Sequence, residues 1–153
     1  MEYIQAAKAG DADGCIFCDL PAEDDDVRTK ILARGELAFV ILNSFPYNPG
    51  HLMVAPFRHV GEFGALETGE LAEIDALIGR SIRVLDDEMQ PHGYNIGMNL
   101  GRVAGAGFPD HVHWHVVPRW NGDTNFMPVV GQTRVLPELL EETGARLRSR
   151  FER

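Results

Sequence analysis

Three histidines at every second position, His111, His113 and His115, are the residues of this chain best suited to chemistry. The residues around them favour β-structure, where alternate side chains point to opposite faces, so we expect the three imidazoles on one face of a strand. The residues expected to face the core are Val112, Trp114 and Val116. Burying imidazoles without partners is costly. The alternation therefore predicts a metal site, a proton relay or a nucleophile rather than a chance polar surface.

A nucleophilic role makes specific demands on the surroundings of such a histidine. A neutral imidazole attacks well near pH 7 and leaves well once it carries a phosphoryl or nucleotidyl group. It needs an acceptor on its far nitrogen, donors for phosphate oxygens and an acid near the leaving group. The pattern favours His113 as nucleophile and His115 as proton donor or phosphate ligand, with backbone N–H groups from the glycine-rich loop 100–110. The competing interpretation is a catalytic zinc held by this H-x-H pattern.

The two cysteines, Cys15 and Cys18, form a C-x-x-C pair. In a cytosolic chain this spacing is typical of half a zinc site or of a redox pair more often than of a structural disulfide. A redox pair is expected to precede a helix, and Pro21 disfavours a helix that continues directly from Cys18. We therefore expect zinc, with a pair of spectator thiols as the alternative. A closed site of two thiolates and two histidines would be structural.

Composition limits the class of protein. A chain of 153 residues, 44% hydrophobic and 24% charged, fits a single domain over residues 1–153 with its own core. No stretch is long and apolar enough for a membrane span, and the N-terminus lacks the pattern of a signal peptide, so a cytoplasmic location is expected. The net charge of −9 argues against a general nucleic-acid binder, although it allows one nucleotide in a pocket.

Hydrophobic periodicity predicts an α+β fold with an antiparallel sheet. The expected strands cover residues 30–34, 37–43, 51–56, 94–99 and 111–119. An apolar stripe predicts a long helix over about 69–89, with Thr68 as its N-cap. A sheet covered on one side leaves its other face for function or for a partner subunit.

The remaining segments have weaker patterns. Residues 1–14 are expected to be a short helix or a loose segment, and residues 19–29 an acidic loop. Residues 120–153 are expected to form an irregular tail followed by a final helix with Pro137 in its first turn. The buried face of that helix is expected to consist of Leu139, Leu140, Leu147 and Phe151.

Residues His111–Pro118 resemble the signature of the histidine triad (HIT) superfamily, which is His-x-His-x-His followed by mainly apolar positions. The resemblance covers residues 15 to about 130. Its other parts are the Pro-x-x-His strand within Asn48–His59, the strand Asn95–Asn99 before the glycine-rich loop, and the cysteine segment Gly14–Cys18. The resemblance implies a five-stranded antiparallel sheet with a long central helix and a C-terminal helix, paired into a homodimer.

The same resemblance implies binding of a purine nucleotide and attack of His113 on its α-phosphorus, which gives a nucleotidyl-histidine intermediate. Water then resolves the intermediate in a hydrolase, and phosphate or a sugar phosphate does so in a transferase. The resemblance implies that His115 contacts the α-phosphate and that His51 orients the nucleophile. The implied nucleotide-binding residues are Asn43 at the ribose, and Asn99, Gly105 and Gly107 at the phosphate.

In members of the family with two cysteines, zinc is held by positions that correspond here to Cys15, Cys18, His59 and His111. The resemblance thus implies a structural zinc that clips the N-terminal segment onto the sheet and contributes folding free energy. Such a metal would also fix the strand that carries the nucleophile.

Two features depart from the commonest family pattern. The loop 104–110 is one residue longer than usual and lacks the Gln or Ser that many members place near the leaving group. The tail Pro118–Phe126, and Asn43 in place of Asp, resemble a branch that includes diadenosine tetraphosphate phosphorylases and Fhit-type hydrolases. Arg58 or Arg119 is a candidate to attract a long polyphosphate. We expect cleavage of a dinucleoside polyphosphate; the alternatives are a nucleoside phosphoramidase, a low-turnover nucleotide-binding module and a zinc hydrolase centred on the triad.

Overall fold

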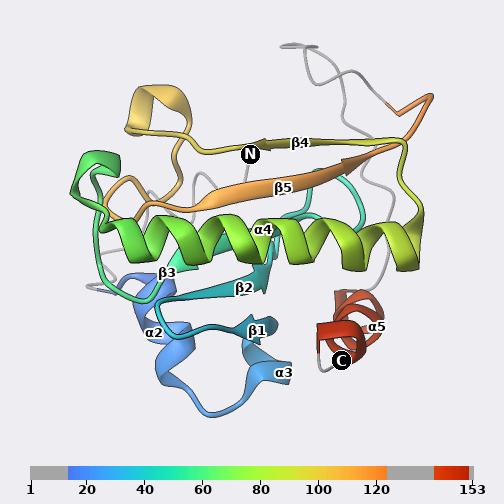
Figure 1. The fold of residues 1–153 in the computed structure, drawn as a ribbon, viewed down its shortest axis with the longest axis horizontal. Coiled ribbons are helices and arrows are strands. Elements are labelled where there is room, and N and C mark those ends of the chain that lie inside the picture. Colours follow the sequence, from blue (N-terminus) through green and yellow to red (C-terminus); the bar gives the residue numbers. More distant parts are fainter. Residues whose placement is uncertain (1–13, 124–139, 152–153) are drawn as a thin grey trace.

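The structure is a computed structural model, and it describes residues 14–123 and 140–151 (Figure 1). Several sequence expectations fall outside these residues: those for residues 1–13, the tail from 124 to 134, Pro137 and Leu139. Within the described part, no helix is long and apolar enough to cross a membrane.

Five strands form one antiparallel sheet in the order β1-β2-β3-β5-β4. They are β1 (Ile31–Arg34), β2 (Ala38–Leu42), β3 (Leu52–Pro56), β4 (Gly93–Gly97) and β5 (Trp114–Arg119). Every residue of β2 and β3 is buried, as expected for apolar strands covered on both faces. The expected α+β fold with a five-stranded antiparallel sheet is confirmed.

The two faces of the sheet carry different cores. The long helix α4 (Thr68–Met89) crosses in front of the strands in Figure 1, and the C-terminal helix α5 (Leu140–Phe151) packs on the same core. This core includes Val40, Leu52, Val54, Ile74, Leu85, Leu147 and Phe151. The short helix α2 (Ile16–Ala22) covers the opposite face through Phe17. Since β-residues alternate, Phe17 meets the other set of strand residues, which are Ile31, Phe39, Ile41, Met53 and Ala55.

The N-terminus of α4 differs by one residue from the expected one, because Glu67 rather than Thr68 is the N-cap. Glu67 accepts from the backbone at Glu70, and the Glu70 carboxylate accepts the Glu67 N–H at 2.8 Å, which completes a capping box. Arg58 donates to the buried carboxylate of Glu70 from Nε at 2.9 Å, and also to the carbonyl of Ala65. Arg58 is therefore engaged in holding this cap.

The expectation that Pro21 prevents a helix after Cys18 is wrong, because α2 begins at Ile16 and includes Pro21 in its last turn. A proline there removes one hydrogen bond at the end of the helix instead of breaking its middle. Part of the expected acidic loop is also helical: α3 covers Asp26–Thr29, and the Asp25 side chain caps it by accepting the Arg28 N–H at 3.0 Å.

The triad strand is shorter than expected. β5 begins at Trp114, so His111 and His113 precede it. The pairing of β5 with β3 runs only from Leu52↔Val116 to Val54↔Trp114. Beyond it, the N–H of Val112 bonds to the carbonyl of Val60 at 2.8 Å. The expected alternation of core-facing valines with histidines is nevertheless kept, since Val112 and Val116 are buried.

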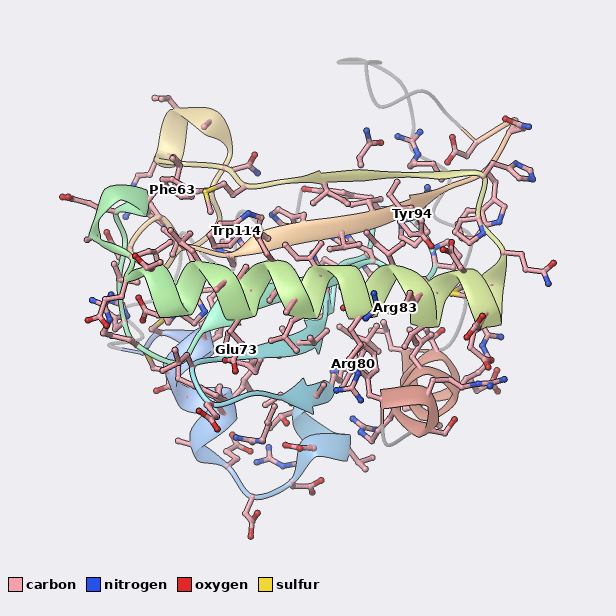
Figure 2. All side chains as sticks on the ribbon, viewed as in Figure 1. Phe63, Glu73, Arg80, Arg83, Tyr94 and Trp114 are labelled. Carbon is pink, nitrogen blue, oxygen red and sulfur yellow. The ribbon has the colours of Figure 1, made fainter. Side chains whose placement is uncertain are left out.

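Two α4 side chains labelled in Figure 2 tie this helix to its neighbours. The Glu73 carboxylate accepts the N–H groups of Glu36 at 2.9 Å and Ala38 at 2.7 Å, which closes the turn between β1 and β2. The Arg80 guanidinium lies 5.1 Å from the centre of the Phe151 ring, a cation–π contact that fastens α5. Leu147 and Phe151 are buried, as the sequence predicts.

Candidate active site and metal centre

Three imidazoles lie side by side on the face of the sheet opposite α4. The ring centres of His113 and His115 are 5.1 Å apart, and those of His51 and His115 are 5.2 Å apart. His51 and His113 are buried. His51 is the residue just before β3, and β5 with the segment before it supplies the other two rings. The structure thus brings together the three residues that were expected to be catalytic.

The hydrogen bonds of His113 define its tautomer. Its Nδ1 lies 2.9 Å from the backbone carbonyl of His111. A carbonyl oxygen only accepts, so Nδ1 carries the proton and Nε2 carries the lone pair of the neutral ring. Burial lowers the pKa of His113, against an opposing effect of the His111 carbonyl. His113 therefore presents a neutral Nε2 with an available lone pair near pH 7.

His51 sets the opposite tautomer on His115. The N–H of Tyr47 donates to Nδ1 of His51 at 3.1 Å, so the proton of a neutral His51 is on Nε2. That Nε2 lies 3.0 Å from Nδ1 of His115, which must accept. His115 consequently keeps its own proton on Nε2. His51 therefore orients His115 directly.

Burial keeps these rings neutral. Burial, with smaller contributions from the neighbouring His115 and His113, lowers the pKa of His51 to about 3. Burial likewise lowers the pKa of His115 to about 4, with a smaller contribution from His113. Charging one ring would place a cation in a poorly solvated site beside other titratable rings. The cluster can therefore offer one lone pair and one N–H donor at neutral pH.

The residues expected to contact a nucleotide lie around this cluster. Asn43 accepts the N–H of Phe45 at 2.9 Å, and its amide nitrogen lies 3.4 Å from Nε2 of His51. The Asn43 amide nitrogen and Nε2 of His51 are both donors, so they do not hydrogen-bond to each other. The hydrogen bond of His51 Nε2 is therefore the one to His115. Asn99 lines a cavity together with His115.

The glycine-rich loop flanks the same cavity. Gly105 has a φ of 90°, a conformation that favours glycine, and a Cβ built there would lie 3.9 Å from the amide nitrogen of Asn99. Gly107 is exposed on the same loop, and Phe108 anchors the loop by an edge-to-face contact with Phe17, with ring centres 5.8 Å apart. The loop is thus held beside Asn99 and, through Phe108 and Phe17, on the side of His113.

Four other side chains converge next to the triad: Cys15, Cys18, His59 and His111. Their potential ligand atoms all lie within 4.8 Å of one another. Cys15 Sγ is 3.2 Å and Cys18 Sγ 3.6 Å from Nδ1 of His111, and Cys18 Sγ is 3.4 Å from Nδ1 of His59. These four are the residues expected to hold a metal.

The donor set fits a tetrahedral metal ion. With metal–sulfur and metal–nitrogen bonds of about 2.3 and 2.0 Å, adjacent sulfur and nitrogen ligands lie about 3.5 Å apart. Nε2 of His111 donates to the carbonyl of Pro56 at 2.9 Å, which leaves Nδ1 as the ligand atom and supplies the usual outer partner of a metal-bound imidazole. Burial and the neighbouring Cys15 raise the pKa of Cys18 to about 11. A metal ion bound there would have to displace the thiol proton and stabilise the thiolate.

Two residues that the sequence reasoning did not single out connect these groups. Phe17 lies between the two cysteines on α2, and its ring stacks on His113 with a centre-to-centre distance of 4.6 Å and an interplanar angle of 26°. Tyr47 packs on His51 with ring centres 4.8 Å apart. For Phe17, its position between the two cysteines of the C-x-x-C pair was the available signal. No pattern in the sequence indicated Tyr47.

The two arginines considered for a polyphosphate make internal contacts. Arg58 holds the N-terminal cap of α4. Arg119 donates from Nε and NH2 to the Asp123 carboxylate at 2.7 and 2.8 Å, and from NH1 to Oδ1 of Asn95 at 2.6 Å. Arg119 thus lies at the end of β4 and β5, where it orients Asn95.

The buried histidines predict acid-sensitive folding. An unfolded histidine has a pKa of about 6.5, whereas that of His51 is lowered to about 3. Between these values the unfolded chain binds more protons, so the free energy of unfolding falls as the pH drops from about 6.5 towards 4. In His51→Gln, which retains a donor for His115, this fall should be shallower. Urea denaturation at several pH values measures it, and equal slopes for both proteins would contradict the assignment.

Comparison with known proteins places these features in context. A family model described as "HIT domain" matches residues 25–122. A protein of Mycobacterium tuberculosis named AP-4-A phosphorylase is 46% identical over 127 residues, which cover 83% of this chain and 65% of that relative. This chain therefore spans less than two thirds of the length of that relative.

Two further similarities cover most of both chains. An adenosine 5′-monophosphoramidase of Schizosaccharomyces pombe is 28% identical over 90% of this chain and 98% of its own. The crystal structure of a Zn-bound histidine triad family protein from Mycobacterium smegmatis matches with a TM-score of 0.72 and 28% identity, over 91% of this chain and 94% of that one.

Proposed function

This chain belongs to the histidine triad (HIT) family, and we propose that it is a nucleotidyl hydrolase or transferase that cleaves a dinucleoside polyphosphate at an α-phosphorus. The observation that carries the proposal is the pair of opposite tautomers on His113 and His115. One ring offers a lone pair and its neighbour offers a proton, as nucleophilic displacement of a phosphate-linked group requires. A relative named AP-4-A phosphorylase supports this substrate class.

In the first step, the Nε2 lone pair of His113 attacks the α-phosphorus and forms a P–N bond. The bond from phosphorus to the bridging oxygen breaks, and its electron pair goes to the leaving nucleotide. The Nε2–H of His115 can protonate or hydrogen-bond that oxygen. The His111 carbonyl, bonded to Nδ1 of His113, stabilises the positive charge that develops on the ring.

In the second step, an acceptor oxygen attacks the same phosphorus and the P–N bond breaks, with its electron pair returning to Nε2 of His113. Water as acceptor gives a hydrolase, and inorganic phosphate gives a phosphorylase. His51 keeps His115 in the tautomer that both steps use. Asn43 is proposed to contact the ribose, and Asn99 with the backbone at Gly105 and Gly107 is proposed to contact the phosphate.

We propose that the four-residue cluster holds a structural zinc. A zinc bound there would fix α2 to the segment that precedes β5 and supply folding free energy. Cys15 and Cys18 lie at the start of α2, and His111 both contributes a ligand nitrogen and offers its carbonyl to His113. The proposed zinc would therefore lie outside the reacting groups, which argues against a triad-centred zinc hydrolase.

A homodimer is the proposed assembly. β4 is an edge strand of the sheet, and Ile96 on it and Leu100 after it are 46% and 47% exposed. An unpaired edge with apolar side chains favours pairing with a second copy. A cytoplasmic location is proposed because both cysteines are free thiols that would serve as metal ligands rather than form a disulfide. The net charge of −9 supports a nucleotide ligand rather than a nucleic acid.

A nucleoside phosphoramidase is the second candidate, because a relative that is similar along nearly its whole length is named adenosine 5′-monophosphoramidase. Its reaction would use the same His113 intermediate with an amine as leaving group. A low-turnover nucleotide-binding module remains the non-catalytic alternative. Turnover of the two substrate classes by one preparation of the protein ranks these functions directly.

Product analysis with diadenosine tetraphosphate tests the proposal. AMP and ATP are expected if water resolves the intermediate, and ADP and ATP, formed only when phosphate is added, if phosphate does. His113→Asn removes the nucleophilic nitrogen and should lower kcat by at least about 1000-fold, because covalent catalysis is lost. Its circular dichroism and AMP affinity should stay close to wild type. Full activity of His113→Asn would refute the mechanism.

Metal analysis tests the zinc proposal separately. The purified protein should contain one zinc per chain, and His59→Asn or Cys15→Ser should lose it. These variants should unfold at least about 5 °C lower, because each kcal/mol corresponds to about 2–4 °C in a chain of this size. The matched control is His92→Asn, since His92 lies outside the cluster and accepts the Asn121 N–H through Nδ1, which an Asn oxygen can replace. Zinc retained in His59→Asn and Cys15→Ser would exclude this site.

A further inference from the structure

A phenylalanine ring lies against the face of the proposed nucleophile. The ring of Phe17 stacks on that of His113, with ring centres 4.6 Å apart and an interplanar angle of 26°. The same phenylalanine lies 5.3 Å from the ring of His111, at an interplanar angle of 46°. Both Phe17 and His113 are buried. One face of the His113 imidazole is therefore covered by a rigid apolar surface.

The hydrogen bond of Nδ1 does not by itself fix the plane of the His113 ring. The His111 carbonyl holds one ring atom, whereas rotation about the Cβ–Cγ bond of a histidine has only broad preferred ranges. The Nε2 lone pair lies in the ring plane, so a tilt of the ring turns the lone pair away from the phosphorus. Attack needs aligned atoms, and a small misplacement costs rate steeply. A flat neighbour against one face restricts this tilt.

Phe17 is itself held from several sides. It lies between Cys15 and Cys18, whose sulfur atoms are 3.2 and 3.6 Å from Nδ1 of His111. The ring of Phe108 meets Phe17 edge-on, at an interplanar angle of 85°. The helix α2 has 7 residues, and the side chain of its N-cap, Cys15, makes no capping hydrogen bond. So short a helix depends on tertiary contacts, so the cysteines and the core determine where the Phe17 ring lies.

Phe39 shows what an ordinary aromatic residue does in the same core. It is buried with Phe17 on this face of the sheet, and it stacks on Phe57 with ring centres 5.1 Å apart and an interplanar angle of 25°. Phe17 and Phe39 therefore resemble each other in burial and in stacking geometry. They differ in the stacked partner, which is a phenylalanine for Phe39 and the proposed nucleophile for Phe17.

We propose, on the basis of the proposed function, that Phe17 is a positioning residue for the reaction. Its ring fixes the plane of His113 and so aims the Nε2 lone pair at the α-phosphorus, and the flanking cysteines fix Phe17. The nucleophile then has two supports, the His111 carbonyl at its edge and the Phe17 ring at its face. The proposed zinc would affect the rate without touching substrate, because it would anchor the helix that carries the stacked ring.

The variants Phe17→Leu and Phe39→Leu compare the two roles. Leucine is apolar but has no flat face, so both variants should lose a similar amount of stability in urea. In Phe17→Leu, single-turnover transfer of the nucleotidyl group to His113 should slow at least about tenfold, equally with diadenosine tetraphosphate and adenosine 5′-phosphoramidate, because both need the same attack. Its affinity for AMP, and the transfer rate of Phe39→Leu, should stay within about twofold of wild type.

The NMR signals of the His113 ring give a readout that needs no substrate. Protons held over the face of an aromatic ring are shifted upfield by its ring current. The His113 ring protons should carry this shift in wild type and in Phe39→Leu, and should lose it in Phe17→Leu. The shift should also weaken in Cys15→Ser without zinc, because Phe17 then loses an anchor. The signals are assigned with His113→Asn.

The outcomes separate this inference from the proposed function. A wild type inactive on both substrates refutes the proposed function, whereas a wild-type His113 without the upfield shift refutes the stacked arrangement. Equal losses of rate in Phe17→Leu and Phe39→Leu, or no loss in Phe17→Leu, refute the positioning role. An unchanged shift in zinc-free Cys15→Ser refutes the part assigned to the cysteines. If Phe17→Leu does not fold, Phe17→Met replaces it, since methionine fills irregular space and also lacks a flat face.

Discussion

The hydrogen bond from Nδ1 of His113 to the carbonyl of His111 is the contact on which the rest of the site depends. It gives the neutral His113 ring a single tautomer and leaves the lone pair on Nε2. The same His111 donates from its own ring to the carbonyl of Pro56 and turns its other nitrogen towards two cysteines. One residue, 1% exposed, thus joins the sheet, the proposed metal-ligand cluster and the proposed nucleophile.

A second network of buried rings gives His115 the opposite tautomer, with the proton on Nε2. The backbone of Tyr47 sets the proton on His51, and His51 sets the proton on His115. Because burial keeps these rings neutral, their roles depend on which nitrogen carries the proton rather than on charge. The phosphates of the proposed substrate would therefore meet oriented N–H groups rather than an array of cations. Such an arrangement would suit one anionic ligand in a protein with a net charge of −9.

The sequence predicted the sheet and the site well where side-chain pattern controls the outcome. Alternating apolar residues located the strands, and the spacing of His111, His113 and His115 identified the cluster. It failed at two helix ends. Pro21 is tolerated because it falls in the last turn of α2, and Glu67 replaces Thr68 as N-cap because Glu70 and Arg58 complete the capping box.

The partners of the imidazoles were likewise beyond sequence reasoning. The stacking of Phe17 on His113 and the bond from His51 to His115 arise only when the fold brings together segments far apart in the chain. The cavity that Asn99 and His115 line depends on the register of β4 against β5, which no local motif encodes. Residue types therefore predicted which groups meet, and the backbone register determines how their protons are arranged.

The most direct test of this account is the tautomeric state of the triad, measured from the ¹⁵N chemical shifts of the histidine rings at pH 7. The account predicts a neutral His113 protonated at Nδ1 and a neutral His115 protonated at Nε2, with assignments made by single His→Asn replacements. Protonation of His113 at Nε2, or an imidazolium at either position, would contradict it, because the nucleophile would then lack its lone pair or the leaving group its donor.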